Sequence, residues 1–155
     1  MADPLVGWLD AACKVFGSIS NRKGGNIRSY RVFEKNEIPA ALELSSPCAV
    51  TYVQDVSVEY VAGGIDALNW GGMTELHITP VVDPSLLADV MWYFTGVLNA
   101  MKANHTLGGR VQWFRLPESE KSIRIIPTTY GQGPAHYALV VTWEVRENVA
   151  LMLSG

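Results

Sequence analysis

Residues 83–104, DPSLLADVMWYFTGVLNAMKAN, carry the strongest helical pattern in the chain. Asp83 and Pro84 are typical of a helix N-cap followed by a first-turn proline. At 100° per residue, the large apolar side chains fall within one stripe about 140° wide, which predicts a face packed against a core. The stripe consists of Leu86, Leu87, Val90, Met91, Phe94, Val97, Leu98 and Met101. The pattern therefore predicts a long helix that ends near Asn104 and anchors the core.

Trp92 lies outside this stripe, almost opposite its centre. The residues around it on that side of the predicted helix are small, namely Ser85, Ala88, Gly96 and Asn99. A tryptophan on a bed of small residues predicts a surface that something else covers. Because single exposed aromatic residues are common, a loop of the same chain and a second protein are both open as the cover.

The remainder of the chain predicts a second helix and several strands. An N-terminal helix follows Asp3 and Pro4 and ends near Gly17. Residues 20–29 predict a polar, glycine-rich loop, and residues 30–46 show no clear pattern. Alternating apolar residues predict strands at 48–60, 74–82, 110–116, 122–126 and 136–147.

Residues 62–72 contain two glycine pairs and are too long for a tight hairpin turn. The sequence predicts a loop here with an apolar tip formed by Ile65, Leu68 and Trp70. A β-bulge is expected near Asp55, where the alternation of the preceding strand shifts.

The order of helix, two strands, long helix and two or three strands predicts an α+β fold. We expect an antiparallel sheet of about four to five strands, with the N-terminal helix and the long helix packed on one face. The chain has 155 residues, of which 48% are hydrophobic and 17% charged, so a single domain spanning 1–155 can bury a sizeable core.

Composition also limits the setting of the protein. No apolar run approaches the roughly 20 residues of a membrane helix, so no membrane partner is expected. The start of the chain carries Asp3 where a signal peptide would be basic, so secretion is not expected. Cys13 and Cys48 make no disulfide framework, although a bridge between them stays open. We expect assembly in a reducing cytoplasm.

The net charge of −3 is unevenly distributed. Residues 36–99 contain no Lys or Arg and carry Glu37, Glu43, Asp55, Glu59, Asp66, Glu75, Asp83 and Asp89. Just before them lies a basic arm that contains Arg22, Lys23, Arg28 and Arg31. The segregation predicts an acidic face and a basic arm, suited to self-assembly or a charged partner, unless the fold mixes these charges on the surface.

Catalytic and metal-binding motifs are missing from the sequence. His77 and His136 could face each other on adjacent strands, but a metal site would need Glu75 or Glu144 as a third ligand. Cys48 beside His77 is conceivable as a nucleophile pair, although nothing marks the thiol as activated. The chain is therefore expected to be no enzyme and to bind no cofactor or metal. The alternative is a small α+β enzyme with a pocket near residues 127–136.

Direct nucleic-acid binding is the third possibility. Tyr30 and Phe33 are interleaved with the basic arm, as in proteins that bind nucleic-acid backbones and stack bases. The acidic balance of the remaining chain argues against it, because nucleic-acid modules are usually basic.

Four segments share their order and pattern with a known family: the helix opening at 3–5, the strand start at 47–50, the helix at 86–101 and the closing strand at 137–143. In these features the chain resembles the tail terminator (tail completion) proteins of long-tailed bacteriophages. The resemblance covers most of the chain but rests on element order rather than on a diagnostic motif. The predicted 62–72 loop and the basic arm have no match in it, so another neck or head–tail connector protein is the alternative.

The resemblance implies a structural virion protein of the tail or neck. Subunits would form a homo-oligomer, expected as a hexameric ring, which caps the tail tube and joins it to the head connector. DNA would pass through a lumen lined by acidic residues of 36–99 without specific binding. The interface residues would be Trp92, Ala88, Gly96, Ile65, Leu68, Trp70, Arg22, Lys23, Arg28 and Arg31.

Overall fold

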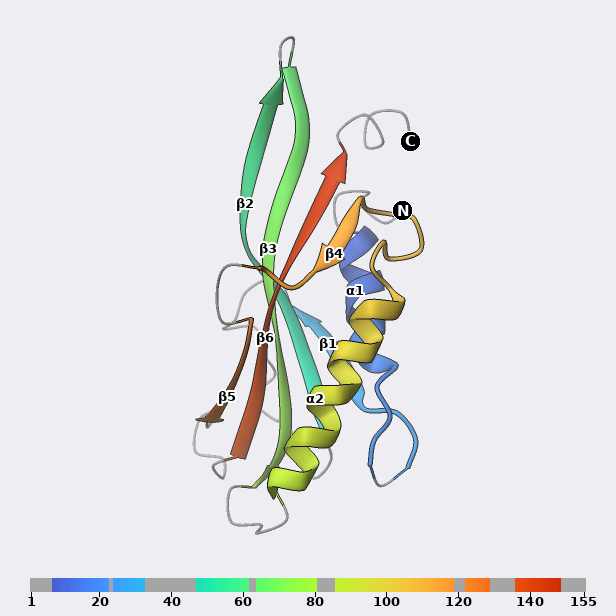
Figure 1. The fold of residues 1–155 in the computed structure, drawn as a ribbon, viewed down its shortest axis with the longest axis vertical. Helices are drawn as coiled ribbons and strands as arrows, with labels where there is room; N and C mark the ends of the chain where they lie inside the picture. The colour runs from blue at the N-terminus through green and yellow to red at the C-terminus, as the bar shows by residue number, and fades with distance from the viewer. Residues whose placement is uncertain are drawn as a thin grey trace.

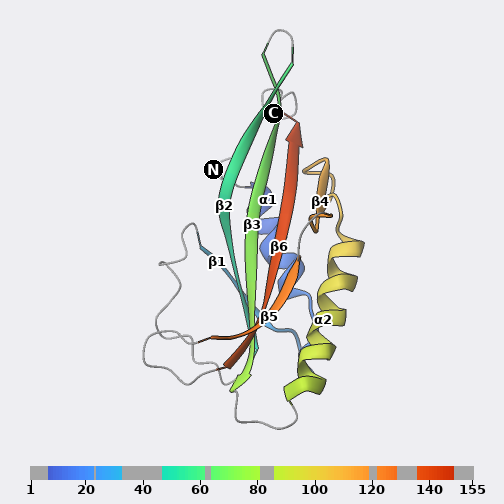
Figure 2. The same cartoon turned by 60° about the vertical axis from the view of Figure 1, so that its left-hand side comes forward.

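Two helices cover one face of a curled sheet (Figures 1 and 2). The structure is a computed structural model that describes residues 7–22, 24–32, 47–61, 64–80, 86–118, 122–128 and 136–148. In these ranges it contains α1 (Gly7–Gly17), α2 (Leu86–Ala103) and a six-stranded sheet. The predicted α+β class, with an N-terminal helix and one longer helix, is confirmed.

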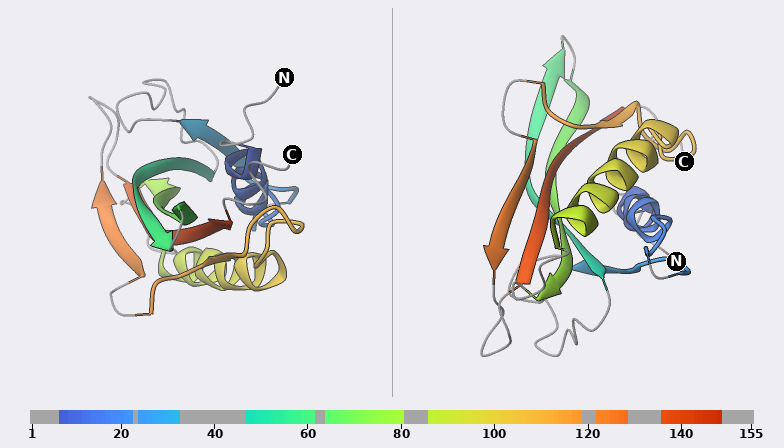
Figure 3. Two further views of the ribbon diagram at one scale, coloured as in Figure 1. Left: turned by 90° about the horizontal axis from the view of Figure 1, so that it is seen from above. Right: turned by 60° about the horizontal axis from the view of Figure 1, so that its bottom comes forward.

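The sheet is built around the hairpin of β2 (Cys48–Val61) and β3 (Gly64–Pro80), which is followed in space by β6 (His136–Asn148). The far edge of β6 pairs with β5 (Ile123–Thr128) and with β4 (Trp113–Arg115). On the other side, β1 (Arg28–Val32) runs parallel to β2. This one parallel pair makes the sheet mixed, whereas the other pairings are antiparallel as the sequence predicted. Figure 3 shows the curl of the sheet from above.

The core lies between the helices and one face of the sheet. The strand pattern predicted for 136–147 is confirmed, because Leu139, Val141, Trp143 and Val145 all point into this core. Leu76 and Ile78 on β3 lie beside them, as the alternation predicted. The bulge predicted near Asp55 is also present, as a register shift between β2 and β3.

The buried face of α2 is rotated relative to the predicted stripe. Val90, Val97 and Met101 are buried as expected. Met91 and Leu98, predicted in the core, are 50% and 40% exposed. Their place is taken by Tyr93, which is 2% exposed and donates its hydroxyl to the side chain of Asn21. The phenol can enter the core because its polar end reaches a partner at the edge of the helix.

The predicted loop at 62–72 is wrong. The β2–β3 ladder continues to the pair of Val61 with Gly64, so residues 64–72 are strand. Neither glycine at 71–72 lies in a turn, and Gly72 has a packing role. A side chain at Gly72 would overlap the ring of Trp143, which crosses the strand on the core face.

We expect Gly72→Ala to lower the free energy of unfolding by about 1–3 kcal/mol, the usual cost of overpacking a core. The added methyl group meets a fully buried indole that has no space to move. Urea unfolding at neutral pH measures the difference.

Gly71→Ala is the matched control, because its methyl group would meet only the exposed side chain of Asp55 on the other face. Asp55 can rotate away, so we expect a change of at most a few tenths of a kcal/mol. Equal losses in the two variants would show that strand conformation, and not the Trp143 ring, decides the cost.

Several predictions lie outside the described residues. These are the caps at 3–4 and 83–84, Lys23, most of 30–46, and the loop at 129–135. Within the described part of the chain, neither helix is long and apolar enough to cross a bilayer.

Candidate interaction surfaces

The β2–β3 hairpin extends beyond both helices and beyond the end of β6 (Figure 1). The last register pair between β3 and β6 joins Ala67 to Asn148, and beyond it no other described strand pairs with the hairpin. Among the described strands, only β1 borders the outer edge of β2, and it pairs with residues 48–52 alone. The hairpin is therefore an arm that offers faces and an edge to a partner.

One face of this arm is apolar. The side chains of this face come from three register pairs: Val56–Trp70, Val58–Leu68 and Tyr60–Ile65. They continue the core face of the sheet beyond the part that α1 covers. We call Val56, Val58, Tyr60, Ile65 and Leu68 the hairpin strip. Tyr60 is 73% exposed, and Val56, Val58 and Ile65 are each more than two-fifths exposed. An apolar run that stays open at the end of a sheet is typical of an interaction site.

Three interface residues were predicted at the tip of a loop, namely Ile65, Leu68 and Trp70. Two of them lie in the hairpin strip, and Trp70 does not. Ile65 and Leu68 are strand residues of the arm. Trp70 is instead half-buried and packs against the core, where its ring lies 5.6 Å from that of Trp8. Its indole N–H donates to Glu147 at 2.6 Å, so Trp70 holds the base of the arm rather than its tip.

The second candidate interaction surface is a groove, and Trp92 forms one of its walls. A groove of about 520 Å³ lies between residues 18–20, which follow α1, and one side of α2. Trp92 is 47% exposed, and Gly96, Ala100 and Ala103 give the groove a floor of small residues. Of the small residues predicted around Trp92, Gly96 and Asn99 line the groove, Ala88 does not, and Ser85 lies outside the described residues. The predicted cover by the same chain is present in part, because the Trp92 indole donates to the carbonyl of Ser20. Cover by a second protein stays a prediction.

Gly96 is required where α2 approaches the end of α1. A side chain there would come within 2.8 Å of Ile19, so the glycine lets the two segments approach closely. Ala88, the remaining predicted interface residue of this helix, is exposed one turn before Trp92.

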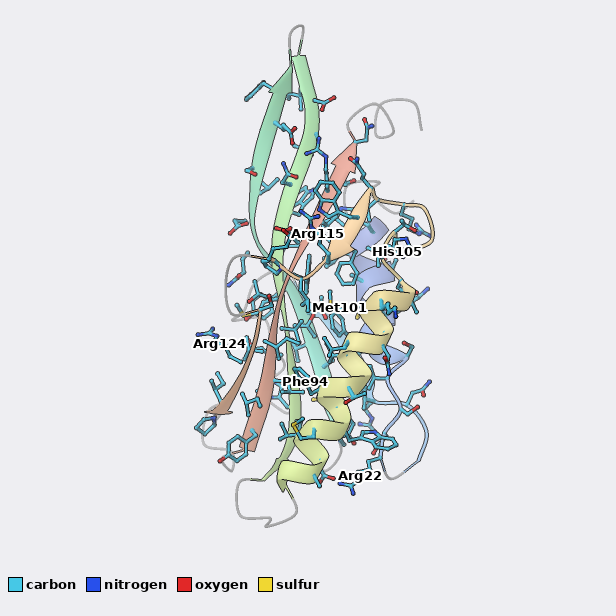
Figure 4. All side chains as sticks on the ribbon, viewed as in Figure 1. Arg22, Phe94, Met101, His105, Arg115 and Arg124 are labelled. Carbon is cyan, nitrogen blue, oxygen red and sulfur yellow. The ribbon has the colours of Figure 1, made fainter. Side chains whose placement is uncertain are left out.

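The basic arm is only partly described. Arg22 follows the groove and pairs with Asp89 of α2 at 2.6 Å (Figure 4). Arg28 is exposed at the start of β1, and Arg31 lies on the same strand. Arg22 and Arg28 therefore lie on different segments, while Lys23 and the side chain of Arg31 fall outside the described part of the chain.

The other face of the hairpin arm is polar. Arg146 pairs there with Glu59 and with Asp66, and Arg115 pairs with Glu144 at 2.8 Å. The Arg146 guanidinium and the Asn69 amide hold the pKa of Glu59 below its usual range. These pairs show that the fold partly mixes the charge blocks of the sequence, as one alternative allowed.

The face of the sheet opposite the helices carries a buried polar cluster near the start of β2. It includes Cys48, the possible nucleophile. Cys48 and His77 are register neighbours, as the sequence suggested, and Glu75 lies 3.6 Å from His77. The hydroxyl of Tyr52 donates to Glu75 at 2.5 Å. Burial raises the pKa of the Cys48 thiol to about 11, so the thiolate needed for attack is strongly disfavoured. The geometry matches a structural polar core better than an activated cysteine.

A disulfide between the cysteines is also excluded. Cys13 packs on the helix side, where its thiol lies 3.1 Å from Ser29, whereas Cys48 points to the opposite face of the sheet. Both are free.

No group of three metal-ligating residues occurs in the described ranges. His77 is in register with Ala138, and the His136 strand position pairs with Pro80, so the two histidines are not direct neighbours. Glu144 is bound to Arg115. The alternative pocket near 127–136 falls mainly on residues outside the described ranges.

Comparison with known proteins gives no family for this chain. No protein-family model matches the sequence, and no curated protein matches it. The hairpin strip and the groove are consequently assigned from their geometry alone.

Proposed function

We propose that this chain is a structural assembly protein that functions as a phage tail terminator, the family whose element order it resembles. Subunits would form a closed ring that caps the tail tube and joins it to the head connector. The observation that carries the proposal is the hairpin strip, an exposed apolar face on an arm that projects past the helices. Such a face is costly in water and is stabilised by burial against another protein.

The charges of the arm fit the same role. Asp55, Glu59 and Asp66 are exposed or half-exposed on the arm, and the last two share one arginine, so the arm keeps an excess of negative charge that would keep passing DNA from binding to the ring. Glu75 is buried and Asp89 is paired with Arg22, so these two acidic residues are poor candidates for a lumen lining.

The native mass across a concentration series tests the proposal. We expect a closed ring of about six subunits, because cyclic symmetry is the form that suits a cap on a tube. Native mass spectrometry and light scattering give the number directly. A protein that stays monomeric and also fails to bind the ends of purified tail tubes would contradict the proposed function.

A further inference from the structure

We propose that the groove beside Trp92 receives the hairpin strip of a second copy of this chain. The inference rests on the proposed self-assembly and names the two surfaces that meet. It predicts a head-to-tail contact, in which the arm of one subunit enters the groove of the next.

The arm cannot fill the groove of its own subunit. Its base is fixed by the ladder to β6 and by the contact of Trp70 with Trp8. The outer end of the hairpin lies beyond both helices in two views (Figures 1 and 2), whereas the groove is lined by the middle and C-terminal part of α2. A strip and a groove that are separated in one subunit can meet only between subunits.

One surface projects and the other is hollow. The groove lining is half polar, and its apolar half consists of Ile19, Trp92, Gly96, Ala100 and Ala103. The groove has a floor of small residues and one aromatic wall, and its volume of about 520 Å³ lies in the range of sites that bury apolar groups. The indole N–H of Trp92 is already bonded to Ser20, so its ring face remains for an apolar contact. Tyr60, the most exposed large apolar residue described, supplies an aromatic partner of the kind enriched at interface centres.

Charge favours the same pairing. Residues 48–80 contain four carboxylates and no Lys or Arg, and Glu59 and Asp66 share a single arginine. Helix spacing places two exposed cations near the groove: Lys14 lies one turn before Ser18, and Lys102 lies about one turn after Asn99. A negative arm near these two lysines gives orientation to the contact, and the like charges of two arms disfavour arm-to-arm pairing.

A contact between two different patches has a distinct consequence for assembly. Each subunit uses one arm and one groove, so subunits follow one another in a single direction and close into a ring when the rotation permits. Arm-to-arm contact would instead stop at a dimer and leave both grooves open.

Mixing two disabled variants tests the inference. Tyr60→Ser with Ile65→Ser removes the strip but keeps the groove, and Asn99→Glu places a carboxylate in the groove but keeps the strip. We expect each variant alone to lose the wild-type mass and become monomeric. Their mixture should form a 1:1 dimer and nothing larger, because one intact arm then meets one intact groove. Native mass spectrometry resolves these species.

The controls separate folding from assembly. Gln112→Glu adds one negative charge at an exposed site away from the groove and should keep the wild-type mass. Ala103→Glu is a second groove variant and should act like Asn99→Glu. Circular dichroism checks that each variant is folded.

The remaining outcomes overturn the inference in different ways. Variants that keep the wild-type ring would show that the ring uses other surfaces, while the proposed function stands. A mixture that stays monomeric would exclude the head-to-tail contact. A monomeric wild type whose tube-end binding is lost in both variants would make the tail tube the occupant, which contradicts the second copy but not the capping function.

Discussion

Trp143→Ala is expected to lower the free energy of unfolding by about 3–5 kcal/mol, the range found when a buried tryptophan is truncated. Trp143 is fully buried and lies in the middle of the helix-covered face. Its ring meets Trp8 edge to face at 5.8 Å and Phe114 at 5.6 Å. Truncation would open a cavity among these rings and leave the Thr74 hydroxyl without the indole N–H that donates to it. Urea unfolding followed by far-ultraviolet circular dichroism measures the loss.

Trp113→Ala provides the matched control. Trp113 is half-buried on the opposite face of the sheet, where the guanidinium of Arg115 lies 4.2 Å from its ring centre. An exposed cation–π contact contributes about 0.5–1 kcal/mol, so the loss should be well below that of Trp143→Ala. Similar losses for the two tryptophans would mean that the core is not centred on Trp143.

The long helix shows what periodicity can and cannot predict. The pattern predicted where the helix lies in the sequence, because apolar spacing follows the helical period. It also predicted most of the buried side, with errors at its edges. It placed Met91 and Leu98 inside and omitted Tyr93, since hydrophobicity alone ranks a phenol below a methionine. The choice depends on whether Asn21, far away in sequence, can accept the Tyr93 hydroxyl.

The hairpin shows a second limit. Gly71 and Gly72 carry a local signal for a turn, and that signal led to the predicted loop. Gly72 is glycine because the Trp143 ring crosses its strand, a reason that comes from a residue far along the chain. The same misprediction concealed the arm, and with it the hairpin strip, whose alternation at Val56, Val58 and Tyr60 was nevertheless visible in the sequence.

The interaction surfaces were predicted unevenly for a related reason. Trp92 and its small neighbours share one helix, so local geometry was enough to group them. Residues 18–20, which form the other side of the groove, come from a different element, and no local pattern relates them to α2. The parallel pairing of β1 was missed in the same way, because its five residues carry no strong alternation of their own.

Glu147→Ala is the second large effect that we expect, a loss of about 2–4 kcal/mol. One oxygen of Glu147 accepts the indole N–H groups of both Trp8, at 2.7 Å, and Trp70, at 2.6 Å. The carboxylate thus ties α1 to the base of the hairpin arm. Removing it leaves the buried Trp8 donor without its acceptor, at about 1–3 kcal/mol, and weakens the hold on Trp70. Urea unfolding and the tryptophan emission wavelength report the two consequences.

Glu147→Gln separates the hydrogen bonds from the charge. Burial raises the pKa of Glu147 in the folded protein, and the two indole donors offset part of that rise. The folded protein therefore binds this proton more tightly than the unfolded chain does, so Glu147 contributes most to stability at low pH. Its contribution falls as the pH rises from the ordinary glutamate pKa of 4.5 through the folded pKa. The glutamine side chain keeps an acceptor but does not titrate. The wild type should consequently lose stability relative to Glu147→Gln across this window, and a constant difference would show that Glu147 does not change its charge there.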